Sequence, residues 1–435
     1  MFHGLPSSFR LDKRRGRVNL TSVIFAIILL FPARIEFFWW VFDTIAVLDI
    51  TLLVLFGSVV VFGLSSAKIS VGDTWIFTIL LLPLILGMIS LIWSISSVDT
   101  AKSIVVYGAA VAAYLVAFAL FRDWHPSQIC KMLIVLPGIM VMTAIASYMP
   151  YSPLSPVMTV PHLGGHSDGF LISYYARFSH PFIGLSNSFA TILAIFLPLV
   201  LVANRIGVWP WIAKTTAVIL VAAVVATGSR GVLLALLIAF GVLALFHVIS
   251  KQSIPRNLGS SVLWGFPVVI LLVAAFFVLS PDAARLLDGR FSLRNVDARF
   301  AAFDSAVRVA LSEFPFGIGS GVSLGSVVDG SLRSVHNAYL QNILWFGVFF
   351  GSVLSLAMMM LPYFIWRIEV LTLQARYVKN AVATSASVLM LINLSQAAWE
   401  GSILRIWIYV ILAIGVVLIR RCDGVAAWGV CGEPN

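Results

Sequence analysis

The stretch Ser103-Ile-Val-Val-Tyr-Gly-Ala-Ala-Val-Ala-Ala-Tyr-Leu-Val-Ala-Phe-Ala-Leu-Phe121 decides the fold class, because it is an uninterrupted apolar run bounded by Lys102 and Arg122. A run of about 20 apolar residues can cross the hydrocarbon core of a bilayer as a helix. The whole chain is 60% hydrophobic and only 11% charged, with a mean hydropathy of +1.03. Soluble domains are about 45–50% apolar and about 25% charged. The composition therefore excludes a soluble enzyme, a disordered chain and a fibrous repeat.

Similar apolar runs recur along the chain and predict an all-α polytopic membrane protein with about 12 transmembrane helices, treated as a single integral membrane domain over residues 1–435. The first run is interrupted by Pro32, Arg34 and Glu36. Residues 10–33 also resemble a secretory signal peptide, so whether residues 1–33 are removed stays open. The predicted spans are 19–39, 45–66, 74–94, 103–121, 129–149, 182–203, 208–226, 232–249, 262–279, 338–364, 380–399 and 402–419.

Basic residues set the predicted orientation of these spans. The chain carries 28 Lys and Arg against 18 Asp and Glu, which gives a net charge of +10. Most of the basic residues fall on alternate segments that include the basic tail 1–18 and the tail 420–435, and cytoplasmic loops collect Lys and Arg in this way. Both termini are therefore expected in the cytoplasm, and the positive balance is attributed to the membrane and not to nucleic acid. The short outer loops carry only Arg34, Lys102, Arg177, Arg230 and Arg405.

Two long outer segments, 150–181 and 280–337, stand out, and the larger one precedes the tenth span. A structureless loop of that length is uncommon unless it has a function. Apolar residues spaced by three and four predict an amphipathic helix near 300–311. Pro315 and the glycines of Gly317–Gly321 end that helix. The backbone amides of this glycine cluster could bind a phosphate, or the cluster could be a turn or hinge, and the sequence leaves both possibilities open.

Arginine is the only basic residue type in segment 280–337, where it includes Arg290, Arg294 and Arg299. Arg230 lies in a tight junction between two predicted spans, and Arg177 precedes another. A guanidinium group suits planar recognition of phosphate, and an arginine at a span boundary is costly unless it is paired or solvated. These arginines are candidate phosphate ligands. The alternative is that they pair with the loop acids Asp282, Asp288, Asp297, Asp304, Glu313 and Asp329, although Arg230 has no acid nearby in sequence.

His336 is the candidate for proton transfer, because it lies at the predicted outer boundary of the tenth span and imidazole titrates near neutral pH. A lone histidine is often only structural, and that role is assigned to His180. His162, His166 and Asp168 have a spacing that could ligate a metal, but no helix is evident there and no metal site is predicted. The three cysteines predict no disulfide framework, and no nucleotide-binding motif is visible. No cofactor is therefore expected.

Four short motifs resemble, in their order along the chain, those of the bacterial O-antigen ligase and polymerase superfamily. The motifs cover roughly residues 177–351. The layout of about 12 spans with a large outer loop adds to the resemblance. Asn187 is followed by Ser188 where that family usually has Asn-Pro, which leaves the subfamily open. The motifs are Arg177-Phe-Ser-His-Pro-Phe, Thr227-Gly-Ser-Arg-Gly, Arg299 with a helix followed by Pro315-Phe-Gly-Ile-Gly, and His336-Asn-Ala-Tyr-Leu-Gln.

The resemblance implies a GT-C-like membrane glycosyltransferase that needs no metal and no nucleotide sugar. Its members take a glycan from undecaprenyl diphosphate at the periplasmic face of the bacterial inner membrane. Ligases transfer the glycan to lipid A core in lipopolysaccharide biosynthesis. Polymerases transfer it to a growing polysaccharide, as in O-antigen or exopolysaccharide biosynthesis. A ligase is the favoured expectation, a polymerase is the alternative, and a flippase of lipid-linked saccharides is a second alternative from another class.

The resemblance also suggests a role for each candidate residue. Because the donor leaves as a diphosphate, cations must gather where negative charge grows. Arg230 and Arg299 are assigned to the diphosphate, with Arg177 as a further candidate. His336 would take the proton of the acceptor hydroxyl. Supporting roles are assigned to Asn337, Arg290 and Arg294.

Overall fold

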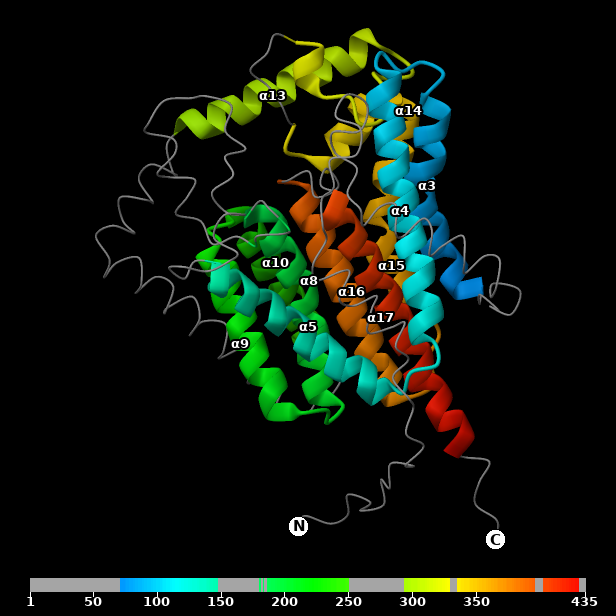
Figure 1. The fold of residues 1–435 in the computed structure, drawn as a ribbon, viewed down its shortest axis with the longest axis vertical. Coiled ribbons are helices and arrows are strands. Elements are labelled where there is room, and N and C mark those ends of the chain that lie inside the picture. The colour runs from blue at the N-terminus through cyan, green and yellow to red at the C-terminus, as the bar shows by residue number, and fades with distance from the viewer. Residues whose placement is uncertain are drawn as a thin grey trace.

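The computed structural model describes residues 71–147, 180, 183, 186–249, 293–328, 335–395 and 402–429. Within them the chain is helix and connecting segments, apart from a single bridge residue at His180 (Figure 1). The predicted spans 19–39, 45–66 and 262–279 lie outside the described residues, as do the basic tail 1–18 and most of segment 150–181. The predicted all-α class is confirmed.

Each predicted span within the described residues overlaps a helix, or for 338–364 the two helices α14 and α15, but the ends differ. The span predicted at 380–399 is found at 373–393, because Thr372 caps the helix with its side-chain oxygen and a polar first turn follows. The helices are α3 (Val71–Ser90), α4 (Ser97–Phe121), α5 (Pro126–Ser147), α8 (Ser186–Arg205), α9 (Pro210–Ala226), α10 (Arg230–Ile249), α13 (Leu293–Ser312), a 3₁₀ turn (Leu324–Ser326), α14 (Ala338–Met359), α15 (Leu361–Trp366), α16 (Leu373–Asn393) and α17 (Ser402–Gly429).

Among the described residues, four helical segments are long and apolar enough to cross a membrane: Ser97–Phe121, Pro126–Ser147, Ser186–Arg205 and Ala338–Trp366. Three shorter apolar helices, Thr74–Ser90, Pro210–Ala226 and Arg230–Gly241, accompany them. The protein is therefore a helical membrane protein, and the count of about 12 spans stays a prediction.

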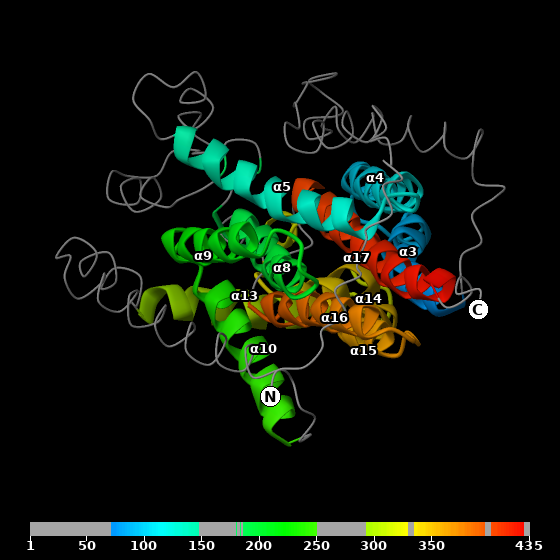
Figure 2. The same cartoon turned by 90° about the horizontal axis from the view of Figure 1, so that it is seen from below.

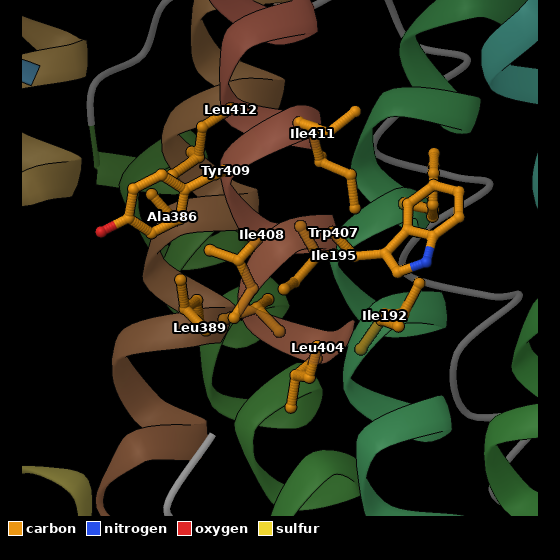
Figure 3. Packing of buried hydrophobic residues seen from close by; sticks show 14 of the residues in the cluster. Ile192, Ile195, Ala386, Leu389, Leu404, Trp407, Ile408, Tyr409, Ile411 and Leu412 are labelled. Atoms are coloured by element: carbon orange, nitrogen blue, oxygen red, sulfur yellow. The ribbon is translucent and has the colours of Figure 1, made fainter. Parts of the chain in front are cut away.

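Helix α17 forms the centre of the bundle. It contacts α4, α5, α8 and α16, and it lies among them when the bundle is seen from one end (Figure 2). Its residues from Leu404 to Ile419 are buried on every side of the helix, as expected for a helix surrounded by protein. Figure 3 shows Trp407 and Ile411 of α17 packed with Ile192 and Ile195 of α8.

The two ends of the bundle carry different elements. Helix α13 lies across one end, which also carries the turn between α3 and α4 (Figure 1). The turn between α4 and α5 lies at the opposite end, where Arg421 of α17 pairs with Asp123 at 3.2 Å. At this end Asp423 also accepts the backbone N–H groups of Leu371 and Thr372 before α16. The side of the membrane on which each end lies stays a prediction.

Candidate functional site

The turn between α9 and α10 exposes Arg230. Thr227 ends α9 with its hydroxyl bonded to the carbonyl of Val224 at 2.6 Å and accepts the N–H of Ser229 at 3.2 Å. Gly228 adopts a φ of 63°, a left-handed conformation that glycine adopts without penalty, and so reverses the chain. Thr227 and Ser229 are buried, whereas Arg230, the first residue of α10, is exposed. The motif thus buries Thr227 and Ser229 and leaves Arg230 exposed at the start of α10.

The segment His336–Asn337 begins α14. Asn337 is the N-cap, and its side-chain oxygen accepts the N–H groups of Tyr339 and Leu340, each at 3.0 Å. Its amide group donates to the carbonyl of Leu394 at the end of α16, at 3.1 Å. Asn337 therefore fixes the start of α14 against α16. These bonds account for much of its hydrogen-bonding capacity, so its expected supporting role toward His336 or a sugar stays a prediction.

His336 itself is exposed and has a φ of 52°. A non-glycine residue with positive φ is uncommon, although histidine is among the types enriched there. Such a conformation persists only where the surrounding structure imposes it, and it gathers at functional sites.

A glycine-rich loop after α13 inserts into a kink of α14. Gly347 inside α14 has φ 78° and ψ 171°, so the helix is interrupted there. The N–H of Ile318 donates to the carbonyl of Leu344 at 2.9 Å, and the N–H of Gly319 to that of Trp345 at 3.0 Å. A Cβ added at Gly347 would lie 1.8 Å from the carbonyl oxygen of Pro315. The two backbones therefore meet at a distance that only glycine allows.

The same loop is tied to α3 and α4 through buried serines. The N–H of Ser320 donates to the hydroxyl of Ser90 at 3.2 Å, and the hydroxyls of Ser320 and Ser103 are 2.8 Å apart. The amides of residues 318–320 thus all have protein acceptors. Of the two interpretations left open by the sequence, the structure favours a docking turn over a phosphate cradle.

The other candidate arginines are placed only in part. Arg294 and Arg299 belong to α13, and the structure describes their backbone alone. Arg177 and Arg290 lie outside the described residues. Elsewhere in α13, Arg308 pairs with Asp304 at 2.9 Å, so the alternative of pairing within the loop holds for that arginine.

Sequence reasoning assigned Arg405 to a short outer loop, and this assignment was wrong. Arg405 lies in the first turn of α17, only 3% exposed, with its guanidinium carbon 3.8 Å from the ring centre of Tyr107 in α4. A buried cation over an aromatic face is stabilised by the ring quadrupole. A single charge beside an apolar run usually marks the end of a membrane span, so Arg405 was predicted in a loop. Its aromatic partner Tyr107 belongs to α4, which is remote in the chain.

Among the described residues, no group of three or more His, Cys, Asp or Glu side chains could hold a metal ion. His162, His166 and Asp168 lie outside the described residues. His180 is 1% exposed and packs on Phe189, with ring centres 5.4 Å apart. Burial lowers the pKa of His180 to about 4, so the imidazole is neutral at physiological pH. This is consistent with the structural role expected for His180.

Residues 215–356 match a family model described as O-antigen ligase. The matched stretch runs from α9 through α14 and includes Arg230, Arg299 and His336. A search of the curated proteins found no match to the chain. The resemblance to the O-antigen ligase and polymerase superfamily is therefore confirmed over this part of the protein.

Proposed function

We propose that this membrane protein, which carries an O-antigen ligase domain, transfers a glycan from undecaprenyl diphosphate to a sugar hydroxyl of lipid A core. The reaction takes place at the periplasmic face of the bacterial inner membrane. The observation that supports this most is that the matched domain contains an exposed Arg230 at the start of α10 and an exposed His336 before the cap of α14.

The bonds that change in this reaction define what the site must do. The acceptor oxygen forms a bond to the anomeric carbon of the donor sugar, and the bond from that carbon to the phosphate oxygen breaks. His336 takes the proton of the acceptor hydroxyl. Arg230 and Arg299 neutralise the departing diphosphate. Arg177 is a third candidate for the diphosphate, and Arg290 or Arg294 assists.

The helix arrangement supports this assignment. Helix α16 contacts both α10, which begins at Arg230, and α14, which follows His336, so the two helices pack against one common helix. In α13, position 299 shares a helical face with Ala302, Ala306 and Ala310, which are buried, and α13 contacts α14. The backbone of Arg299 thus belongs to the face of α13 that is turned to the bundle.

The test is a complementation experiment in a strain that lacks the gene. His336→Ala, Arg230→Ala and Arg299→Ala are expected to keep normal protein levels but lose the glycan product on lipopolysaccharide gels. Arg308→Ala is the matched control, because Arg308 lies on the same helix as Arg299 but pairs with Asp304 on the exposed face. Its product is expected to be normal.

The accumulated material separates the alternatives. A ligase defect leaves lipid-linked polymer that is not attached to lipid A core, whereas a polymerase defect leaves single repeat units. Full product from all three site variants would contradict an enzyme and favour a flippase, which needs no single histidine.

A further inference from the structure

Helix α13 has three faces of different character. Its packed face carries small buried residues, Ala302, Ala306 and Ala310. Its polar face carries the exposed ion pair of Asp304 and Arg308. Between these two faces runs an apolar row that is largely exposed in the part of the chain that the structure describes. This apolar row consists of Phe300, Phe303, Val307 and Leu311, with Phe314 just beyond the end of the helix. Phe300 is 64%, Leu311 62% and Phe314 66% exposed, whereas Phe303 is half-buried against the core.

The spacing of the apolar row follows the helix, since its members recur at three and four residues. An isolated exposed apolar residue needs no explanation, but a continuous row on a charged helix indicates a contact surface. The order of the faces is that of a helix lying in a membrane interface, with its apolar side in the acyl region and its polar side in water.

The position of α13 along the bundle agrees with that geometry. Helix α3 has 20 residues and is therefore about 30 Å long, and its apolar part, Thr74–Ser90, is shorter than the four candidate spans. Trp93 lies in the turn that follows α3, and tryptophan is enriched at the boundaries of membrane spans. The ring of Phe316, just after α13, lies 5.1 Å from that of Trp93. The end of α13 thus stands at the boundary of the spanning segment.

The apolar row also continues into the lipid-facing surface of the bundle. Beyond Phe316 and Trp93, the ring of Phe350 in α14 lies 6.4 Å from Trp93, and exposed Phe349 is next to it at 5.3 Å. Exposed Ile92 lies beside Trp93 in the chain.

We infer that α13 is a membrane-surface helix: its apolar row inserts into the lipid at this end of the bundle, and its packed face rests on α14. The partner of this surface is the lipid bilayer itself. The inference does not rest on the proposed glycan transfer, and it holds whichever side of the membrane this end occupies.

Nitroxide accessibility in vesicles tests the inference on the full chain. Cys130, Cys422 and Cys431 are replaced by alanine, and single cysteines are introduced as Phe300→Cys and Leu311→Cys in the apolar row. Asp304→Cys and Ser312→Cys are the matched positions on the polar face. The spin-labelled protein is reconstituted into phosphatidylethanolamine and phosphatidylglycerol. Collisions with oxygen, which partitions into lipid, are compared with those of a water-soluble nickel chelate.

The labels at 300 and 311 are expected to show a severalfold larger ratio of oxygen to nickel collisions than those at 304 and 312. Equal ratios on both faces would mean that the helix lies in water and would overturn the inference. Low collision rates with both reagents at 300 and 311 would overturn it too, because another protein segment would then cover the row. Both pairs of positions are exposed, so the labels should leave folding intact, which size-exclusion chromatography verifies.

Discussion

The backbone N–H of Ile318 donates to the carbonyl of Leu344 across 2.9 Å, and this bond joins the loop after α13 to the interior of α14. Leu344 lies one turn before Gly347, where the helix is interrupted. An interruption frees carbonyl groups from the helical pattern, and here the loop supplies their donors. The kink and the loop therefore stabilise each other, which links α13 to the helix that His336 precedes.

Substitution of Gly347 by alanine is expected to destabilise the protein strongly. The added Cβ would lie 1.8 Å from the carbonyl oxygen of Pro315, and the φ of 78° is unfavourable for alanine. Left-handed strain and overpacking together predict a loss of about 3 kcal/mol or more. The measurement is the thermal unfolding midpoint of the detergent-solubilised protein.

The control for this substitution is Gly138→Ala in α5, where nothing lies within 4 Å of the added carbon. Alanine favours the helix over glycine by about 0.5–1 kcal/mol, so this variant should be as stable as the native protein or more so. Equal midpoints for Gly347→Ala and Gly138→Ala would contradict the tight backbone contact.

The cap at Asn337 leads to a graded prediction. Asn337→Ala removes the acceptor of two N–H groups and the bond to Leu394, and should cost about 1–2 kcal/mol. Asn337→Ser keeps a capping oxygen and should recover part of that loss. Unfolding midpoints of the two variants check the order, and a serine variant as unstable as the alanine variant would argue against the cap.

The contact between Arg405 and Tyr107 predicts a coupling free energy. In a desolvated position a cation–π pair is worth about 2 kcal/mol, so the double variant with both residues changed to leucine should lose less than the sum of the single variants. The same cycle between Arg405 and Tyr363, whose ring belongs to α15 and contacts Arg367, serves as the distant control. Coupling of equal size in both cycles would exclude a specific pair.

His180 predicts a loss of stability in acid. Its pKa is about 4 in the folded protein against an ordinary value of 6.5, because burial disfavours the charged imidazole. Its contribution is therefore complete above pH 6.5 and falls as the pH drops toward 4. The loss amounts to about 3 kcal/mol at the acid end. His180→Phe, which cannot titrate, should show a smaller drop in unfolding midpoint between pH 7 and pH 4, and parallel curves for the two proteins would refute the effect.

Apolar runs predicted the positions of the helices well, because a helix surrounded by lipid or by protein needs apolar side chains. They placed the ends less well. Charge ends a membrane span but not a helix, so α16 begins at Leu373 and passes Arg376 and Lys379 before its apolar part. Helix α17 likewise continues beyond Arg420. The apolar pattern thus indicates which residues are surrounded by lipid or protein, whereas the capping residue Thr372 determines where α16 begins.

The local structure of the candidate site could be predicted where a short motif forms its own hydrogen bonds. Thr227 to Arg230 forms a turn from its own hydrogen bonds, and Asn337 is a typical capping residue. The kink at Gly347 was not foreseen, because its cause is a loop about thirty positions earlier that supplies donors to its carbonyls. The burial of Arg405 was missed for the same reason, since Tyr107 is remote in the chain.

The central position of α17 has a consequence for biogenesis. All the other described helices precede α17 in the chain, so they leave the ribosome before the helix around which they pack. Until α17 is inserted, the faces of α4, α8 and α16 that it will cover must face lipid or be shielded by insertion factors. Co-translational assembly therefore stays incomplete until α17 is inserted. A nonsense codon before α17 would remove the helix against which α4, α5, α8 and α16 pack.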